Sequence, residues 1–292
     1  MQQPVAAYLE GGKRLHLQHG PIDLIIGAEA ADDVARHAAY TAAVERFETI
    51  LTGLVAELPV LRAQLTPGAV RPSDPVGVRM VEAATRHCQD RFVTPMIAVA
   101  GSVADEILVT MIGAAELQRC YVNNGGDIAL FLAPGAHFSV AMADAGGLDL
   151  GRVKIHPEHQ IGGIATSGQK GRSLSFGIAD SVTVLGANAA QADVAATLIA
   201  NAVNLPGHPD LRYERASDIV YDSDLGDRHV VVHVPALTQG QKGAALARGK
   251  KAALGMLERH LIKGAALFLQ GESVLIGQEN LEFTKQMEMQ NA

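Results

Sequence analysis

Hydrophobic residues recur along this chain with two different periods, and the changes between them predict an ordered series of helices and strands. Helical spacing predicts helices at residues 30–58, Val76–Phe92, Ile97–Leu117, 189–203 and 238–262. Alternation of apolar and polar residues predicts a hairpin within residues 13–28, a second hairpin at 264–276, and strands at 119–123, 127–132, 137–143, 152–155, 161–165, 173–177, 180–185 and 229–234. Residues 206–228 follow neither period and are predicted to be irregular.

The order of these elements predicts the class of fold. Strands come in hairpin-linked groups between helices rather than in strict alternation with them, which favours an α+β fold with antiparallel sheets. The 292 residues allow one large domain or two closely packed ones. Two helix starts rich in small residues, Val99–Glu106 and 187–193, both reach an Ala-Asp pair, although this match is too short to prove a repeat.

Composition and charge exclude several functions. The formal net charge of −7 argues against general binding to a phosphate backbone, and with only 4% aromatic residues the chain offers single-stranded nucleic acid few side chains to stack on. The first residues lack a basic segment followed by a long apolar run, so neither a signal peptide nor a membrane span is expected. Cys88 and Cys120 form no Cys-x-x-Cys motif. We expect a reduced, cytoplasmic protein that binds neither nucleic acid nor membranes.

The segment from residue 161 to residue 197 carries the richest candidate chemistry. Its loop, Thr166 to Gly171, offers backbone N–H groups, two hydroxyls and the Lys170 ammonium, all of which suit phosphate oxygens. In the helix that follows, Asp193 and Thr197 are four residues apart, so their oxygens share one face, as the ligands of a hard cation such as Mg²⁺ would. The alternative is a hairpin followed by a helix in which Asp193 is solvated and Thr197 bonds to its own turn.

A second candidate lies between two apolar strands, at Asn123-Asn124-Gly125-Gly126-Asp127. A hairpin turn fully explains this pattern, because Gly and Asn tolerate the backbone angles that tight turns require. The functional alternative is that Gly125 and Gly126 let a ligand approach the backbone while Asp127 bonds a ribose or ring donor. Both interpretations remain open from the residues alone.

These motifs resemble a known family. Gly125–Asp127, Thr166–Gly168 and Asp193–Thr197 occur in the order and rough spacing of the ApbE superfamily, whose best-known members are FAD:protein FMN transferases. The chain looks closest to a cytoplasmic side branch of it, marked by VTPMIAVAGSVADEI and YVNNGGDIAL. The resemblance implies duplicated T-fold-like units of antiparallel sheets with packed helices. We therefore expect a single domain over residues 1–292, with two pseudo-repeated halves at about 1–150 and 151–292.

The resemblance also implies a site and its cofactors. It implies that Asp193 and Thr197 bind Mg²⁺ beside a flavin nucleotide, FAD or FMN, in a transferase or hydrolase. The residues expected to contact the nucleotide come from the turn and the loop: Gly125, Gly126, Asp127, Thr166, Ser167, Gly168, Lys170 and Arg172.

Two departures from the family pattern widen the choice of function. Residues Arg172–Asp180 stand where flavin transferases carry a His ahead of Asp-Pro, and Gly101–Asp105 replaces a Lys-Gly pair. The alternatives are therefore an enzyme of pterin or C1-carrier cofactor biosynthesis, or a non-catalytic protein for cofactor binding or maturation. In each case the expected ligand is a small nucleotide-like or pterin-like molecule, and a homodimer is expected because sheet edges invite pairing.

Overall fold

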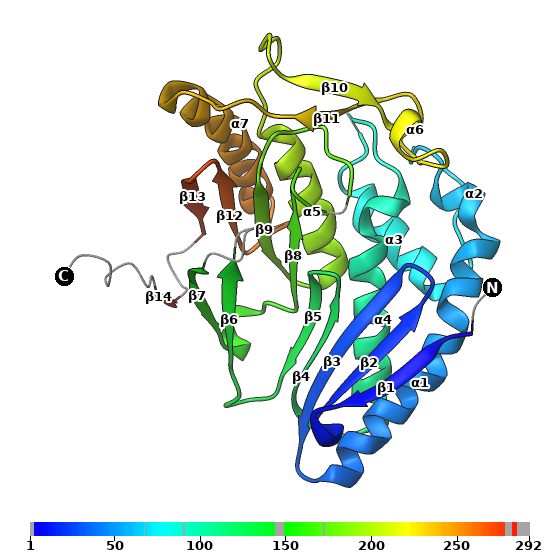
Figure 1. Ribbon diagram of the computed structural model, residues 1–292. Helices are drawn as coiled ribbons and strands as arrows, with labels where there is room; N and C mark the ends of the chain where they lie inside the picture. Colours follow the sequence, from blue (N-terminus) through cyan, green and yellow to red (C-terminus); the bar gives the residue numbers. More distant parts are fainter. Residues whose placement is uncertain are drawn as a thin grey trace. The chain divides into compact units, whose positions relative to one another are not determined.

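The structure is a computed structural model that describes residues 3–66, 68–89, 91–143, 149–171, 173–277 and 282–284 (Figure 1). The chain divides into two units that interleave along the sequence. Unit 1 comprises Met1–Ala136, Ile161–Ala165 and Gly186–Val194, and unit 2 comprises His137–Gln160, Thr166–Leu185 and Ala195–Ala292. Strands β8 (Gly163–Ser167) and β9 (Ser181–Gly186) and helix α5 (Ala189–Ala202) each contribute residues to both units, with β9 lying in unit 2 except for Gly186.

Unit 1 is built on an antiparallel sheet in which sequence neighbours pair. Its strands are β1 (Val5–Leu9), β2 (Arg14–His19), β3 (Ile22–Ala30), β4 (Leu117–Asn124) and β5 (Asp127–Leu132), followed by the first residues of β8. The alternation of apolar and polar residues determines which face is buried, because successive side chains of a strand point to opposite faces. Leu15 and Leu17 of β2, together with Leu24 and Ile26 of β3, accordingly lie in the core.

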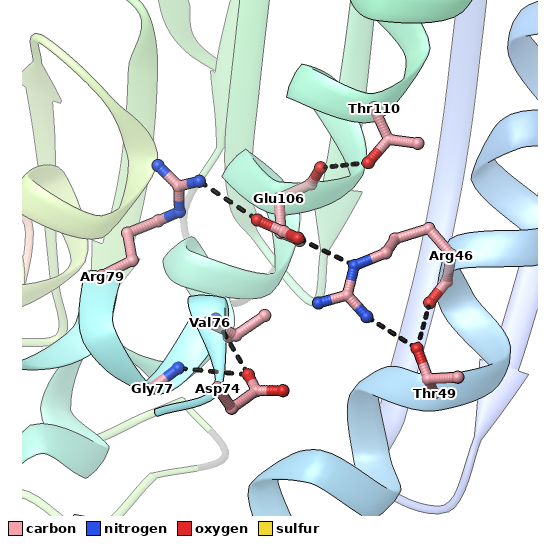
Figure 2. A network of polar contacts seen from close by, with 8 residues as sticks. All are labelled: Arg46, Thr49, Asp74, Val76, Gly77, Arg79, Glu106 and Thr110. Carbon is pink, nitrogen blue, oxygen red and sulfur yellow. Dashed lines mark hydrogen bonds and ion pairs between the residues drawn. The ribbon is translucent and has the colours of Figure 1, made fainter. Parts of the chain in front are cut away.

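The helices of unit 1 are α1 (Asp33–Ala56), α2 (Leu58–Leu61), α3 (Pro75–Thr85) and α4 (Val99–Ala114), and a short 3-10 turn, η2 (Pro95–Ala98), leads into α4. Helices α1 and α4 pack on one face of the sheet (Figure 1). Asp74 caps α3, since its carboxylate accepts hydrogen bonds from the N–H groups of Val76 and Gly77 (Figure 2). Helix α3 ends at Thr85 rather than at Phe92, because the Val93 carbonyl accepts the N–H of Leu65 and belongs to an extended segment.

One described stretch, Pro95–Ala114, is long and apolar enough to cross a membrane by length and composition. In unit 1 this stretch is mostly a core helix. The residues Val103, Ala104, Ile107 and Met111 are fully buried, and α4 contacts α1, α3, β4 and β5.

Unit 2 contains three groups of paired strands. Strands β9 (Ser181–Gly186), β12 (Gly264–Leu269) and β13 (Glu272–Ile276) form one group, and α7 (Gln239–Glu258) packs on β12 and β13. Strands β6 (Phe138–Ala143), β7 (Asp149–Ile155) and β14 (Glu282–Thr284) form the second, and β10 (Arg212–Arg215) pairs with β11 (His229–His233) in the third. The short helices η1 (Glu10–Gly12) of unit 1, η3 (Pro157–His159) and α6 (Ala216–Ile219) complete the elements.

The predicted fold class is confirmed, since helices accompany strands that pair antiparallel throughout the described residues. The strand predicted at 173–177 is wrong. The Phe176 N–H bonds to the side chain of Asn201, and the Ile178 N–H bonds to the carbonyl of Val203. These two N–H groups therefore bond at the end of α5 rather than to a neighbouring strand. The prediction of an irregular 206–228 is also wrong, because β10 and α6 lie there: pairing with β11 supplies a hydrogen-bonding partner that a polar local sequence does not indicate.

Candidate functional site

Helix α5 begins in unit 1 at a buried carboxylate that comes from α4. Asp105 accepts the N–H of Ala189 at 3.0 Å through Oδ1 and the N–H of Ala190 at 2.9 Å through Oδ2. The side chain of Asn188 accepts the next N–H, that of Gln191, at 2.9 Å. These acceptors satisfy donors that a helix start otherwise leaves without partners. Asp105 is only 4% exposed, and burial raises its pKa to about 6 although the two N–H groups act to lower it.

Asp193 lies on the first turns of α5 and is buried. Its Oδ2 accepts the N–H of Gly101, in the first turn of α4, at 3.1 Å. Burial raises the pKa of Asp193 well above its usual range, and the negative charges of Asp127 and Asp105 raise it further. The alternative of a solvated Asp193 is therefore wrong, since the residue is 9% exposed.

Thr197, one turn further along α5, belongs to unit 2, and its hydroxyl donates to the hydroxyl oxygen of Ser167 at 3.3 Å. The alternative in which Thr197 bonds back to its own turn is thus not what the structure shows. Because the Thr197 proton is directed to Ser167, the lone pairs of the Thr197 oxygen are available to coordinate a cation. The neighbouring Thr166 is exposed, and its hydroxyl lies 2.9 Å from that of Thr183.

The Thr-Ser-Gly loop is held by a carboxylate that the sequence motifs did not single out. Asp180 forms an ion pair with Lys170 at 3.0 Å, and its Oδ2 accepts the N–H of Gln270 at 2.6 Å. Gly168 lies against the same residue, because a Cβ there would be 2.5 Å from the Asp180 carbonyl oxygen. Lys170 is therefore engaged, although its side chain is 49% exposed. Arg172, the second predicted cation, lies outside the described residues.

The Gly-Gly-Asp motif forms the turn between β4 and β5. Gly125 and Gly126 have φ angles of 64° and 113°, values that L side chains rarely adopt, and the side chain of Asn123 accepts the N–H of Gly126 at 2.9 Å. The hairpin interpretation is therefore confirmed. Asp127 is close enough to Asp193, within unit 1, for its charge to raise the pKa of that residue. The turn thus brings a third carboxylate toward the start of α5.

The segment that replaces the family histidine is anchored to α5. Ser175 is buried, and its hydroxyl donates to the Gly177 carbonyl at 3.1 Å and lies 3.3 Å from Oδ1 of Asn201. A Cβ at Gly177 would overlap the carbonyl oxygen of Ala200, so only glycine fits there. This segment contains hydroxyl groups and the Asp180 carboxylate but no imidazole.

The donor set near α5 suits a cation that keeps much of its own hydration. Among the described residues, no three His, Cys, Asp or Glu side chains are placed to hold a metal by themselves. One carboxylate and one hydroxyl, completed by water and ligand phosphate oxygens, is a coordination typical of Mg²⁺. Within the same described ranges, neither Asp105 nor Asp193 forms an ion pair, although the charge of Arg79 acts to lower the pKa of Asp105.

Comparisons with known proteins agree with the motifs. The family described as AbpE bacteria matches residues 6–275, and the chain belongs to this family. A UPF0280 protein of Methanothermobacter thermautotrophicus is 35% identical over 189 residues, which cover 63% of this chain and 70% of the relative. A UPF0280 protein of Methanopyrus kandleri is 29% identical over 212 residues, which cover 72% and 83%.

Similar solved structures are more distant. The flavinyl transferase ApbE of Pseudomonas stutzeri, in its apo form, has a TM-score of 0.41 and 13% identity and covers 98% of this chain and 96% of its own. The flavin transferase ApbE of Vibrio cholerae has a TM-score of 0.35 and 13% identity, and 97% of each chain is covered. Membership of the family therefore rests on the family match and on the relatives.

Proposed function

We propose that this protein binds a flavin nucleotide, FAD or FMN, together with a Mg²⁺ ion that contacts Asp193 and Thr197. The observation that supports this most directly is the burial of Asp193, which forms no ion pair with the described residues. The negative charges of Asp127 and Asp105 are close enough to act on it. Burying such a charge is costly unless an opposite charge or a proton compensates it. A bound divalent cation would supply that compensation.

Each part of the proposed site has a task that its chemistry supports. The Asp193 carboxylate and the Thr197 hydroxyl are hard oxygen ligands one helical turn apart on α5. Mg²⁺, when bound, supplies charge neutralisation to the diphosphate. The hydroxyls of Thr166 and Ser167 and the backbone at Gly168 are suited to phosphate or ring oxygens.

Lys170 can contact a phosphate ligand only if it leaves its ion pair with Asp180. In the structure its ammonium contacts Asp180, which also accepts the backbone N–H of Gln270. Asp180 therefore keeps a hydrogen bond if Lys170 turns toward an anion, and the half-exposed ion pair opposes that movement with at most about 1 kcal/mol. We assign Lys170 as a cation that Asp180 holds near the loop until an anionic ligand arrives.

The proposed function does not include standard protein flavinylation. The position of the family histidine is occupied by a segment without an imidazole. Its Ser175 is buried and hydrogen-bonded, and its one carboxylate, Asp180, is engaged by Lys170 and by the N–H of Gln270. Loss of a positioned proton-transfer group typically lowers a rate by about 10²–10⁴. We therefore propose ligand binding with metal as the retained function, and a reaction other than standard flavin transfer if one occurs.

The test is a calorimetric titration of the purified protein with Mn²⁺ and with FAD, the latter in the presence of Mn²⁺. The wild type is expected to bind both, and Asp193→Ala is expected to lose metal-dependent binding. Thr197→Val should weaken the binding of Mn²⁺. The matched control is Thr110→Val, which removes a helix hydroxyl that donates to the Glu106 carbonyl of its own helix.

Three outcomes would contradict the proposal. Equal Mn²⁺ affinity in the wild type and Asp193→Ala would remove the metal assignment. Equal effects of Thr197→Val and Thr110→Val would remove the role of the Thr197 hydroxyl. Binding of a reduced pterin but not of FAD, measured in the same way, would replace the flavin by the pterin alternative.

A further inference from the structure

Helices α4 and α5 each contribute an Asp whose carboxylate accepts backbone N–H groups from the first turn of the other helix. Asp105 of α4 accepts the N–H groups of Ala189 and Ala190, at the start of α5. In return, Asp193 of α5 accepts the N–H of Gly101, at the start of α4. Each Asp comes four residues after the helix-start residue whose N–H bonds to the other Asp, Gly101 in α4 and Ala189 in α5. All of these groups belong to unit 1.

The two helix starts are also in direct backbone contact. A Cβ at Gly101 would overlap the carbonyl oxygen of Ala189 and would lie 2.7 Å from the nitrogen of Ala190. A Cβ at Gly163, in β8, would overlap the nitrogen of Ala189 from another side. The first turn of α5 is therefore held between glycines, and Asp105 is the polar group that aligns it.

We infer that Asp105 is a positioning residue for the site on α5, because it fixes the first turn of that helix and thereby the placement of the Asp193 carboxylate. This inference rests on the proposed function, in which Asp193 binds a divalent cation. Asp193 lies one turn after Ala189, so a shift or rotation of the helix start is passed to it through rigid helical backbone. Residues that orient metal ligands from outside typically contribute a factor of about 10–100 to metal affinity.

Asp105 acts through α5 rather than as a ligand. Both of its oxygens accept backbone N–H groups of the α5 start, at 3.0 and 2.9 Å, whereas only Oδ2 of Asp193 accepts the N–H of Gly101. Four residues after Asp105 stands Val109, which is 56% exposed, whereas the equivalent place after Asp193 holds the hydroxyl of Thr197. Of the two matching helices, α5 alone carries the Asp–Thr ligand pair, and the Asp of α4 serves alignment.

The next residue of α4 provides a matched control. The Glu106 carboxylate accepts hydrogen bonds from Arg46 Nε at 2.7 Å and from an Arg79 guanidinium nitrogen at 3.1 Å (Figure 2). Its side chain is largely buried, like that of Asp105, but in the part of the chain that the structure describes its ion-pair partners lie on α1 and α3 and none lies on α5. Replacing Glu106 by Gln therefore disturbs the packing of α4 and leaves the contact with α5 in place.

The experiment measures Mn²⁺ alone, by the electron paramagnetic resonance of free and bound ion, on four proteins: the wild type, Asp105→Asn, Glu106→Gln and Asp193→Ala. We expect Asp105→Asn to lower Mn²⁺ affinity about tenfold or more and to broaden the bound signal. Glu106→Gln should stay within about twofold of the wild type. Urea unfolding measures the stability of Asp105→Asn and Glu106→Gln. If both variants lose a similar amount of stability, a loss of Mn²⁺ affinity in Asp105→Asn alone is not explained by destabilisation.

The outcomes separate this inference from the proposed function. If the wild type binds Mn²⁺, Asp193→Ala does not, and Asp105→Asn matches Glu106→Gln, the role of Asp105 is overturned while the metal site stands. A wild type that binds no Mn²⁺ overturns both. Should Asp105→Asn fail to fold, Asp105→Glu carries the test, since it keeps the charge but moves both oxygens by one methylene. Wild-type affinity and line shape in Asp105→Glu would then overturn the inference.

Discussion

The close contact between the starts of α4 and α5 makes a sharp prediction about Gly101. In Gly101→Ala the new methyl group would overlap the Ala189 carbonyl oxygen and would lie 2.5 Å from the Ala189 carbonyl carbon. These obstacles are backbone atoms of a helix start, which cannot rotate away as the end of a flexible side chain can. The substitution therefore has to move one helix relative to the other.

The expected magnitude is the difference between two opposing effects. Overpacking of a well-packed interior typically costs about 1–3 kcal/mol, and rigid obstacles favour the upper end. Replacing Gly by Ala inside a helix contributes about 0.5–1 kcal/mol in the opposite direction. The net expectation for Gly101→Ala is a loss of about 2 kcal/mol in the free energy of unfolding.

The control lies on the same helix. A Cβ at Gly113 of α4 would meet nothing within 4 Å, so Gly113→Ala should stabilise the protein by up to about 1 kcal/mol. The assay is urea unfolding of both variants followed by far-ultraviolet circular dichroism, with the midpoints and slopes compared. If Gly101→Ala were as stable as Gly113→Ala, the two helix starts would not be in contact, and the reasoning about α5 would fail with it.

Further predictions concern titration, the loop, activity and assembly. Because burial raises the pKa of Asp105 to about 6 and that of Asp193 well above its usual range, both carboxyls hold protons more readily in the folded state than in the unfolded state. The contribution of these two carboxyls to the free energy of unfolding should therefore decrease as pH rises from about 4 through 6. Urea midpoints of the wild type and Asp105→Asn at several pH values test this, and a difference independent of pH refutes it. Asp180→Ala should destabilise the protein by about 1–3 kcal/mol, because it leaves the part-buried N–H of Gln270 without its acceptor, whereas Lys170→Gln should cost less than about 1 kcal/mol. Equal losses on chemical denaturation would contradict the role given to Asp180. Incubation with FAD, Mg²⁺ and a protein carrying a flavinylation sequence should give no fluorescent covalent product, and efficient labelling would restore standard transferase activity. Light scattering at low micromolar concentration should show a homodimer, and a monomer would remove that expectation.

The sequence by itself determined the local elements and the family. Helical spacing located α1, α4, α5 and α7, and the Gly125–Gly126 pair located a turn, because these features depend on contacts between residues close in the chain. The motif order placed the chain in the family that the match over residues 6–275 confirms. The i, i+4 spacing of Asp193 and Thr197 on one helix was also predictable, since a helix fixes that geometry locally.

Only the tertiary structure decided what surrounds these residues. Gly101 and Asp193 are 92 residues apart in the chain, and Asp105 and Ala189 are 84 apart, so no local pattern could indicate their hydrogen bonds. The burial that raises the pKa of Asp193, and the pairing of Lys170 with Asp180, likewise arise from distant segments brought together. Residues 173–177 have the alternation of a strand but bond to the end of α5 instead. Charge, burial and hydrogen bonding depend on which segments meet in space, whereas periodicity along the chain reports only which face of each element is apolar.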